Sequence, residues 1–291
     1  MTDLILLEDN AMKYGIVVDS GCDLKTLNQT LNQINFTRVP LKLDIGDKVF
    51  VDDFNLDIES YMKDMYAYKG KTGSAAPSPQ AWLEAYEKSD CIFAISITST
   101  LSGSYASAKT AYDMFKEQYP DKKIHLIDSL SAGPEISLIA EKLVIYIESG
   151  MDFEAICEQI DAYCKQTHLL FVLKSLDNFI KNGRVSKVKG TLAGLLGIKL
   201  LGVASEQGDL ELLQKCRGKL TAYEHLKDEM LVRGYKGGKV IIAHCFAPEL
   251  AKFLSNSLRE LFPNCSTEIM PTSGLCSYYA EQGGILVGFE A

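Results

Sequence analysis

The sequence predicts an α/β protein of two domains, the first over residues 1–166 and the second over residues 167–291. In the first part, short apolar runs alternate with helical patterns, which is typical of a mostly parallel sheet with helices on both faces. In the second part, one pair of apolar runs is joined by a tight turn, which indicates a mixed or antiparallel α/β domain. The chain has 291 residues and is 47% apolar, so it can bury a substantial core.

The strands of the N-terminal part are expected where short apolar runs occur. The clearest is 91-CIFAISI-97, since an uninterrupted apolar run of this length is typical of a buried strand. Further strands are predicted at 14–19, 36–40 and 123–128. Helices are predicted at 24–34, 57–69, 79–88, 103–117, 134–149 and 152–166. The segment 41–53 differs, because two alternating runs about Gly46 and Asp47 predict a hairpin.

The C-terminal part is predicted to contain a second hairpin, in which the turn 206-EQGD-209 joins the runs 198–204 and 210–216. Further strands are predicted at 168–174, 238–246, 265–270 and 284–290. Helices are predicted at 175–181, 185–195, 219–233, 247–262 and 274–280. No linker rich in Pro, Gly or Ser marks the boundary near residue 166.

Charge and hydropathy narrow the classes of function. The formal net charge is −8 and no basic stripe is evident, which argues against a nucleic-acid partner. The N-terminus lacks the order of basic region, apolar core and cleavage site that a secretory signal has. No apolar run approaches the ~18 residues of a membrane helix. We therefore expect a cytoplasmic protein without stable membrane insertion.

The eight cysteines include no C-x-x-C pair, and most lie inside apolar segments. They are expected to act as small core residues in a reducing compartment. The four histidines are scattered, so no metal site and no cofactor is predicted.

Two hydroxyl-rich stretches, 74-SAAPSP-79 and 98-TSTLSGSY-105, each lie where a loop turns into a helix. Ser78 is a suitable N-cap and Pro79 suits the first helical position. The second stretch follows the strand at 91–97, and a strand, a hydroxyl-rich turn and a helix N-terminus together outline an anion site. Ser102 and its neighbours could equally be helix caps that satisfy local backbone groups.

The chain resembles the DegV family of bacterial fatty-acid-binding proteins. The resemblance extends from the first strand to the helix after Arg217. It rests on motifs in the expected order, namely 17-VVDSGCDL-24, 38-RVPLKL-43, 72-TGSAAPSP-79, 98-TSTLSGSYASA-108, 126-LIDSLSAG-133, 176-LDNFIKNGRVS-186, 198-IKLLGV-203 and 215-KCRGK-219.

The resemblance implies that hydroxyls of the first two loop motifs hold the carboxylate of a long-chain fatty acid. The residues of this sequence that match the family's carboxylate-binding positions are Ser74, Ser102, Gly103 and Ser104. Ala75 replaces a serine that is usual in the family. Thr72 is a possible substitute for it.

The acyl chain is then expected to run between the domains, in a tunnel whose wall includes 168–173 and 191–203. The segments by themselves are also compatible with ordinary core.

The resemblance also implies a partner, a fatty acid kinase that phosphorylates the bound acid and serves phospholipid metabolism. The role of contacting this kinase falls on Arg217. Arg184, by contrast, follows a glycine in a turn, where an arginine usually points to solvent or anchors a carboxylate of its own fold. Near the C-terminus, Tyr279 stands where characterised kinase partners carry a histidine, and we expect its hydroxyl to contribute to binding the carboxylate.

Two other functions compete with that of a non-catalytic carrier. A serine-dependent acyl hydrolase or transferase using Ser102 would need an activating base, and the sequence has neither a G-x-S-x-G elbow nor a placed His–Asp pair. A phosphotransfer role would need a phosphate-binding glycine loop or a reactive histidine, and His125 and His244 lie inside predicted strands. The carrier is the function that the sequence favours.

Overall fold

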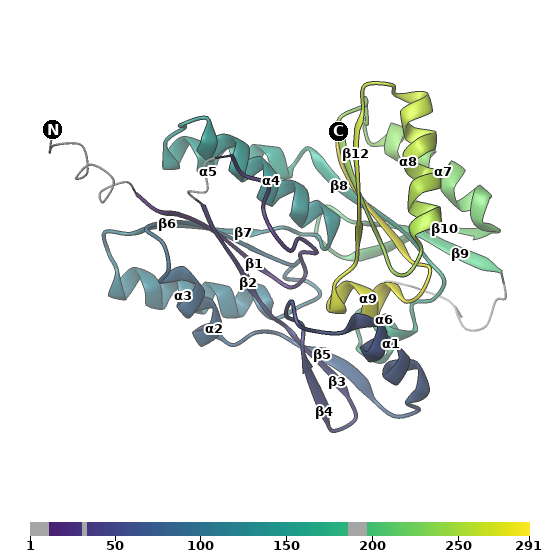
Figure 1. Ribbon diagram of the computed structural model, residues 1–291, viewed down its shortest axis with the longest axis horizontal. Helices are drawn as coiled ribbons and strands as arrows, with labels where there is room; N and C mark the ends of the chain where they lie inside the picture. Colours follow the sequence, from purple (N-terminus) through teal and green to yellow (C-terminus); the bar gives the residue numbers. More distant parts are fainter. Residues whose placement is uncertain (1–11, 31–33, 186–196) are drawn as a thin grey trace, which may run out of the picture.

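Four parallel strands with helices on both faces form the first sheet of the protein (Figure 1). The computed structural model describes residues 12–30, 34–185 and 197–291. The order in the first sheet is β2-β1-β6-β7, and neighbouring strands are parallel. The bounds are Tyr14–Asp19 for β1, Ile34–Val39 for β2, Cys91–Ser96 for β6 and Lys123–Asp128 for β7. The predicted parallel sheet is therefore confirmed.

Alternate residues of these strands pack on opposite helical layers. Val17 and Ala94 face α2 (Pro79–Tyr86) and α3 (Ser104–Gln118). Ile16 and Phe93 belong to the other core, which includes α4 (Pro134–Glu148) and α5 (Phe153–Cys164). Both faces of the sheet are thus buried, as expected for parallel strands.

The second sheet has the strand order β10-β9-β8-β13-β11-β12. Its neighbours are antiparallel except for the parallel pair β11 and β12, so the predicted mixed sheet is confirmed. The strands are β8 Thr167–Leu173, β9 Ile198–Ala204, β10 Leu210–Arg217, β11 Lys239–His244, β12 Ser266–Pro271 and β13 Ile285–Glu290. Helices α7 (Lys219–Val232) and α8 (Pro248–Leu261) cover one face, and α4 packs on the other.

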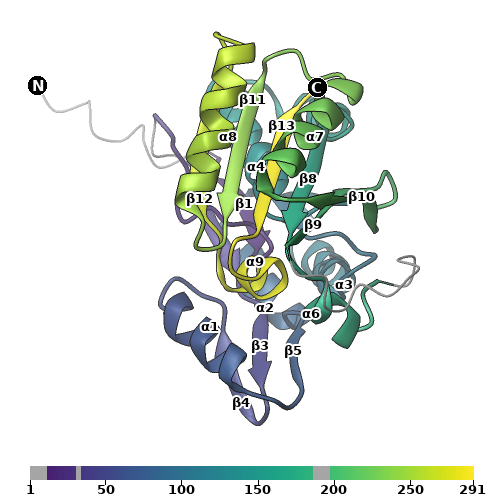
Figure 2. The same cartoon turned by 90° about the vertical axis from the view of Figure 1, so that its right-hand side faces the viewer.

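A small sheet extends below the two large ones (Figure 2). Its order is β4-β3-β5, with β3 at Lys42–Ile45, β4 at Lys48–Val51 and β5 at Thr72–Ala75. The predicted hairpin is present, and Gly46 adopts φ 59° in its turn. Helix α1 (Ile58–Ala67) contacts α9 (Gly274–Ala280), and α6 (Asp177–Lys181) contacts β5 and α9.

Helix α2 begins as its sequence predicts. The Ser78 hydroxyl accepts a hydrogen bond from the backbone N–H of Ala81 at 3.2 Å, and Pro79 occupies the first turn. The Ser78 hydroxyl thus provides a partner for one of the N-terminal amides that have none inside the helix. Proline has no N–H, so Pro79 leaves one such amide fewer.

The structure differs from the sequence-based expectations at two places. The helix expected at 24–34 is wrong over its described residues, because residues 24–30 are not helical and Ile34 begins β2. Strand β5 was not predicted. The helix expected at 185–195 lies almost wholly outside the described residues. No helix in the described part of the chain is long and apolar enough to span a membrane.

Candidate functional site

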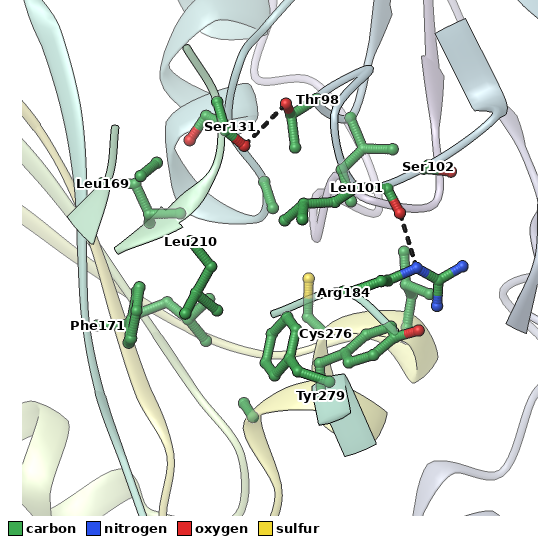
Figure 3. Close-up of a pocket in the computed structure, with 18 of the residues that line it drawn as sticks. Thr98, Leu101, Ser102, Ser131, Leu169, Phe171, Arg184, Leu210, Cys276 and Tyr279 are labelled. Atoms are coloured by element: carbon green, nitrogen blue, oxygen red, sulfur yellow. Dashed lines mark hydrogen bonds between the residues drawn. The ribbon is translucent and has the colours of Figure 1, made fainter. Parts of the chain in front are cut away.

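A pocket with about 780 Å³ of empty space, its mouth included, lies between the first sheet's loops and the second sheet. Its lining is mostly apolar and comes from loops after β6 and β7, from β8, from β10 and from α9 (Figure 3). The apolar lining residues are Leu41, Ile97, Leu101, Ala132, Leu169, Phe171, Leu173, Phe179, Ala204, Leu210, Leu275, Ala280 and Leu286. Such a pocket suits an apolar ligand.

One side of this pocket carries a polar group formed by Ser74, Arg184 and Tyr279. Arg184 Nη1 donates a hydrogen bond to Ser74 Oγ at 3.0 Å. The Tyr279 hydroxyl lies 3.0 Å from the same Ser74 oxygen. In Figure 3 Arg184 and Tyr279 lie together, across the pocket from Leu169, Phe171 and Leu210. The pocket therefore has a polar end and an apolar body.

Arg184 is held in place by backbone and aromatic contacts. Its Nε donates to the carbonyl oxygen of Leu101 at 2.7 Å (Figure 3). Its guanidinium carbon lies 5.3 Å from the centre of the Tyr279 ring, and the Phe179 ring packs against that ring in a tilted arrangement with the centres 4.5 Å apart. No carboxylate of the described residues forms an ion pair with it.

Burial lowers the pKa of Arg184, yet a guanidinium stays charged in proteins. The pocket thus holds a fixed positive charge. The expectation that Arg184 points to solvent or anchors a carboxylate of its own fold is wrong.

The serines of the second loop divide into one that lines the pocket and one that does not. Ser102 lines the pocket, and its Oγ accepts from the Ser104 backbone N–H at 3.2 Å. Ser104 is fully buried, and its hydroxyl donates to Asp19 Oδ2 at 2.5 Å. Gly103 is the exposed N-cap of α3 and does not line the pocket. Ser104 and Gly103 therefore shape the turn.

Asp19 fastens this turn to the first sheet. Besides Ser104, its carboxylate accepts from the backbone N–H groups of Gly21 and Ile97, each at 2.9 Å. Burial raises the pKa of Asp19 to about 6 despite these donors. The turn at 98–104 is thereby fixed against β1.

Thr72 and Arg217 also lie outside the pocket lining. The buried Thr72 hydroxyl is 2.9 Å from the Tyr278 hydroxyl, which also accepts from Asn182 Nδ2 at 2.9 Å. Thr72 thus supports the neighbour of Tyr279. Arg217 is exposed at the end of β10.

Helix α9, which carries Tyr279, is anchored by buried carboxylates. Asp52 accepts from the backbone N–H groups of Gly274 at 2.9 Å and Leu275 at 2.8 Å. Burial raises the pKa of Asp52, and the nearby Arg38, 3.1 Å away, opposes this shift. A negative charge at a helix N-terminus is favourable, so the arrangement fixes α9.

The expected tunnel walls are only partly visible. Leu169, Phe171 and Leu173 of β8 line the pocket through alternate side chains, as the pleat requires. Of the segment 191–203, residues 191–196 lie outside the described residues, and none of 198–203 lines the pocket, whereas Ala204 does.

The chemistry available at Ser102 is limited. In the described part of the chain, the hydrogen bonds of His125 and His244 are made with Asp161 Oδ1 and with the Ala247 N–H, and neither involves Ser102. The described His, Cys, Asp and Glu residues form no group that could hold a metal ion. All eight cysteines are free.

These features define a class of protein, an α/β binding protein whose mostly apolar pocket lies between its two large sheets and carries a charged group at one end. The model of the DegV family, which describes its members as uncharacterised, matches residues 13–291. The chain belongs to the DegV family.

Relatives and solved structures cover nearly the whole chain. A DegV domain-containing protein of Streptococcus pneumoniae is 48% identical over 96% of this chain and 99% of its own length. The crystal structure of the Fatty Acid Kinase B3 protein of S. pneumoniae, loaded with linoleic acid, matches with a TM-score of 0.93 and 48% identity, over 96% of this chain and 99% of that one. A DegV family protein of Eubacterium eligens, loaded with heptadecanoic acid, matches with a TM-score of 0.90 and 39% identity, over 96% and 99%.

Proposed function

We propose that this protein is a non-catalytic carrier that binds one long-chain fatty acid in the pocket between its sheets. The observation that carries the proposal is Arg184, a cation without a described carboxylate partner, beside Ser74 and Tyr279 in a mostly apolar pocket. A carboxylate there would gain a charge-assisted hydrogen bond. The fatty acids in two similar structures support this assignment.

The carboxylate site in this proposal consists of Ser74, Ser102, Arg184 and Tyr279. Thr72, Gly103 and Ser104, which the resemblance suggested, support it from behind through Tyr278 and the turn at 98–104. The acyl chain extends along Leu173, Phe171 and Leu169 of β8.

The energetics favour capture of a long chain. Burying about fifteen methylene groups at ~0.8 kcal/mol each gives about 12 kcal/mol of gross transfer free energy. Lost translational freedom and chain flexibility offset a good part of it. The remainder is enough for tight binding with few polar contacts.

The carrier acts in the cytoplasm and presents the bound carboxylate to a fatty acid kinase. The similarity to the Fatty Acid Kinase B3 protein supports this partner. Arg217 contacts the kinase in this proposal, and its exposed position on β10 leaves it accessible. We assign residues 1–166 to the domain with the anion-binding loops and 167–291 to the domain that completes the tunnel, with α4 packed between their sheets.

Native mass spectrometry of the protein purified from a bacterial host tests the proposal. We expect a retained mass of fatty-acid size that is released on denaturation. Arg184→Gln is expected to lower retention at least tenfold, because it removes a charged donor from an enclosed site. Arg233→Gln is the matched control, since Arg233 pairs with Glu229 and does not line the pocket. An empty protein that cleaves acyl esters through Ser102 would favour the hydrolase instead.

A further inference from the structure

Two threonine hydroxyls of the first half of the protein bind the turn between β9 and β10 at the carbonyl group of Gly208. Thr98 Oγ1 and Thr100 Oγ1 lie 3.0 Å and 2.6 Å from the carbonyl oxygen of Gly208, and each donates a hydrogen bond to it. Gly208 adopts φ 81°, and a Cβ there would lie 2.2 Å from Thr98 Oγ1 and 3.1 Å from Leu130 Cα. Only glycine allows this close approach.

This turn lines the pocket at the end away from Arg184. Leu173 pairs with Leu200 and Leu170 with Val203, so β9 runs back along β8 away from α6. Helix α6 lies at the polar end, because its Phe179 ring packs against the Tyr279 ring.

The chain after β9 therefore turns at the opposite end, beside Leu169. The described residues of the turn that line the pocket there are Gly208 and Asp209, with Ala204 before them and Leu210 after them.

Behind the turn lies a second hollow with about 2090 Å³ of empty space, open solvent included. Its lining contains many charged and polar residues, among them Asp128, Glu135, His168, Glu206, Glu211, Glu229 and Arg233. Ala204 lines both hollows. Ser131 lines the pocket, and its hydroxyl donates to Glu135, which lines the second hollow. The two spaces therefore adjoin at Ala204 and at the Ser131–Glu135 pair.

We propose that the turn 205–209 is the end-stop that sets the length of the acyl chain, and that Thr98 and Thr100 hold it closed. The inference rests on the fatty-acid binding proposed above. Each methylene group inside the pocket gains transfer free energy, whereas one pushed past Gly208 would meet a polar, solvated surface and gain none. Chains longer than the pocket are therefore rejected by the turn and not by the carboxylate site.

The test is a competition experiment with two end-stop variants. The delipidated protein is incubated with an equimolar series of even-numbered saturated acids from myristic to behenic acid, and the retained masses are compared by native mass spectrometry. Thr98→Val combined with Thr100→Val removes both donors, and Gly208→Ala forces the turn away from Thr98. In both we expect the ratio of retained arachidic to stearic acid to rise about tenfold, because the displaced turn lengthens the pocket and lets two further methylene groups stay inside it.

Two control variants distinguish loss of the end-stop from a general loosening of the folded protein. Gly150→Ala matches the backbone strain of Gly208→Ala, since Gly150 has φ 77° with nothing within 4 Å of a Cβ. Ser99→Ala removes a neighbouring exposed hydroxyl that makes no described contact with the turn. Both controls are expected to keep the wild-type chain-length profile.

An unchanged profile in folded end-stop variants, or an equal shift in the controls, would overturn the end-stop alone. Wild-type protein that retains no acid of any length would overturn the proposed function and the end-stop with it. If Gly208→Ala fails to fold, the double threonine variant decides.

Discussion

The hydroxyl of Tyr279 lies 3.0 Å from Ser74 Oγ, although the two residues are 205 positions apart. Ser74 belongs to the small sheet and Tyr279 to α9 of the second half. Arg184 donates to the same serine oxygen, so three distant segments meet at one point. The polar end of the pocket exists only in the folded chain.

Tyr279→Phe is expected to weaken fatty-acid binding about tenfold, because a hydrogen bond to a charged group is worth about 1.5 to 3 kcal/mol. Titration of delipidated protein with a fluorescent fatty acid measures the change. Tyr68→Phe is the control, since Tyr68 is 44% exposed and does not line the pocket. Tyr279→His should bind within about threefold of wild type, because a histidine can donate to the carboxylate. Equal affinities of Tyr279→Phe and wild type would remove Tyr279 from the site.

Asp52→Ala is expected to destabilise the protein by about 3 to 5 kcal/mol, because it leaves Arg38 buried without its partner and removes both acceptors at the start of α9. Urea unfolding followed by circular dichroism gives the change. Asp57→Ala, which removes the N-cap of α1, should cost only about 1 kcal/mol. Similar losses in the two variants would show that Asp52 acts as an ordinary cap.

Much of the fold could be predicted from the sequence, because the local pattern of apolar and polar residues indicates most of the strands and helices. The run 91–97 is apolar throughout and becomes the buried β6. For the segment 24–30 the pattern predicts a helix that does not form, because Leu24 and Leu27 have helical spacing. Both residues instead pack against the core, and the preceding residue, Asp23, accepts hydrogen bonds from Ser273. Strand β5 has no apolar alternation and is fixed by pairing with β3.

The binding site could be predicted from the sequence less completely than the fold. The hydroxyl-rich loops indicate an anion site, but pattern does not say which hydroxyls face the pocket. Ser102 does, whereas Ser104 turns inward to Asp19, a partner 85 positions earlier. Arg184 was missed because its contacts, Leu101 and Ser74, are also distant. The only local signal is that Gly183 reverses the chain after α6, with φ 68°.

Glu135 makes the stability of the protein depend on pH. Burial raises its pKa from 4.5 to about 7, while hydrogen bonds from Ser131 and Thr167 oppose the shift. Between pH 4.5 and 7 the folded protein keeps the proton that the unfolded chain releases, so stability falls as pH rises, by about 3 kcal/mol over this window.

Glu135→Gln should remove this contribution, and comparison of its urea unfolding with wild type at several pH values measures it. Glu84→Gln, at an exposed position, should keep the wild-type slope. Parallel curves for wild type and Glu135→Gln would show that Glu135 ionises at its ordinary pKa in the folded state.

Leu169→Trp tests whether the pocket itself holds the acyl chain. Leu169 and Leu170 are adjacent on β8 but face opposite ways, Leu169 into the pocket core and Leu170 into the core under α7 and α8. A tryptophan at Leu169 can occupy pocket space, so we expect retention of long-chain acids to be lost while the melting temperature stays within a few degrees of wild type. Leu170→Trp overpacks a filled core, so we expect a loss of about 1 to 3 kcal/mol in stability with binding preserved in the folded fraction. If Leu169→Trp still retains a full-length acid, the chain does not run along β8, and the tail lies elsewhere.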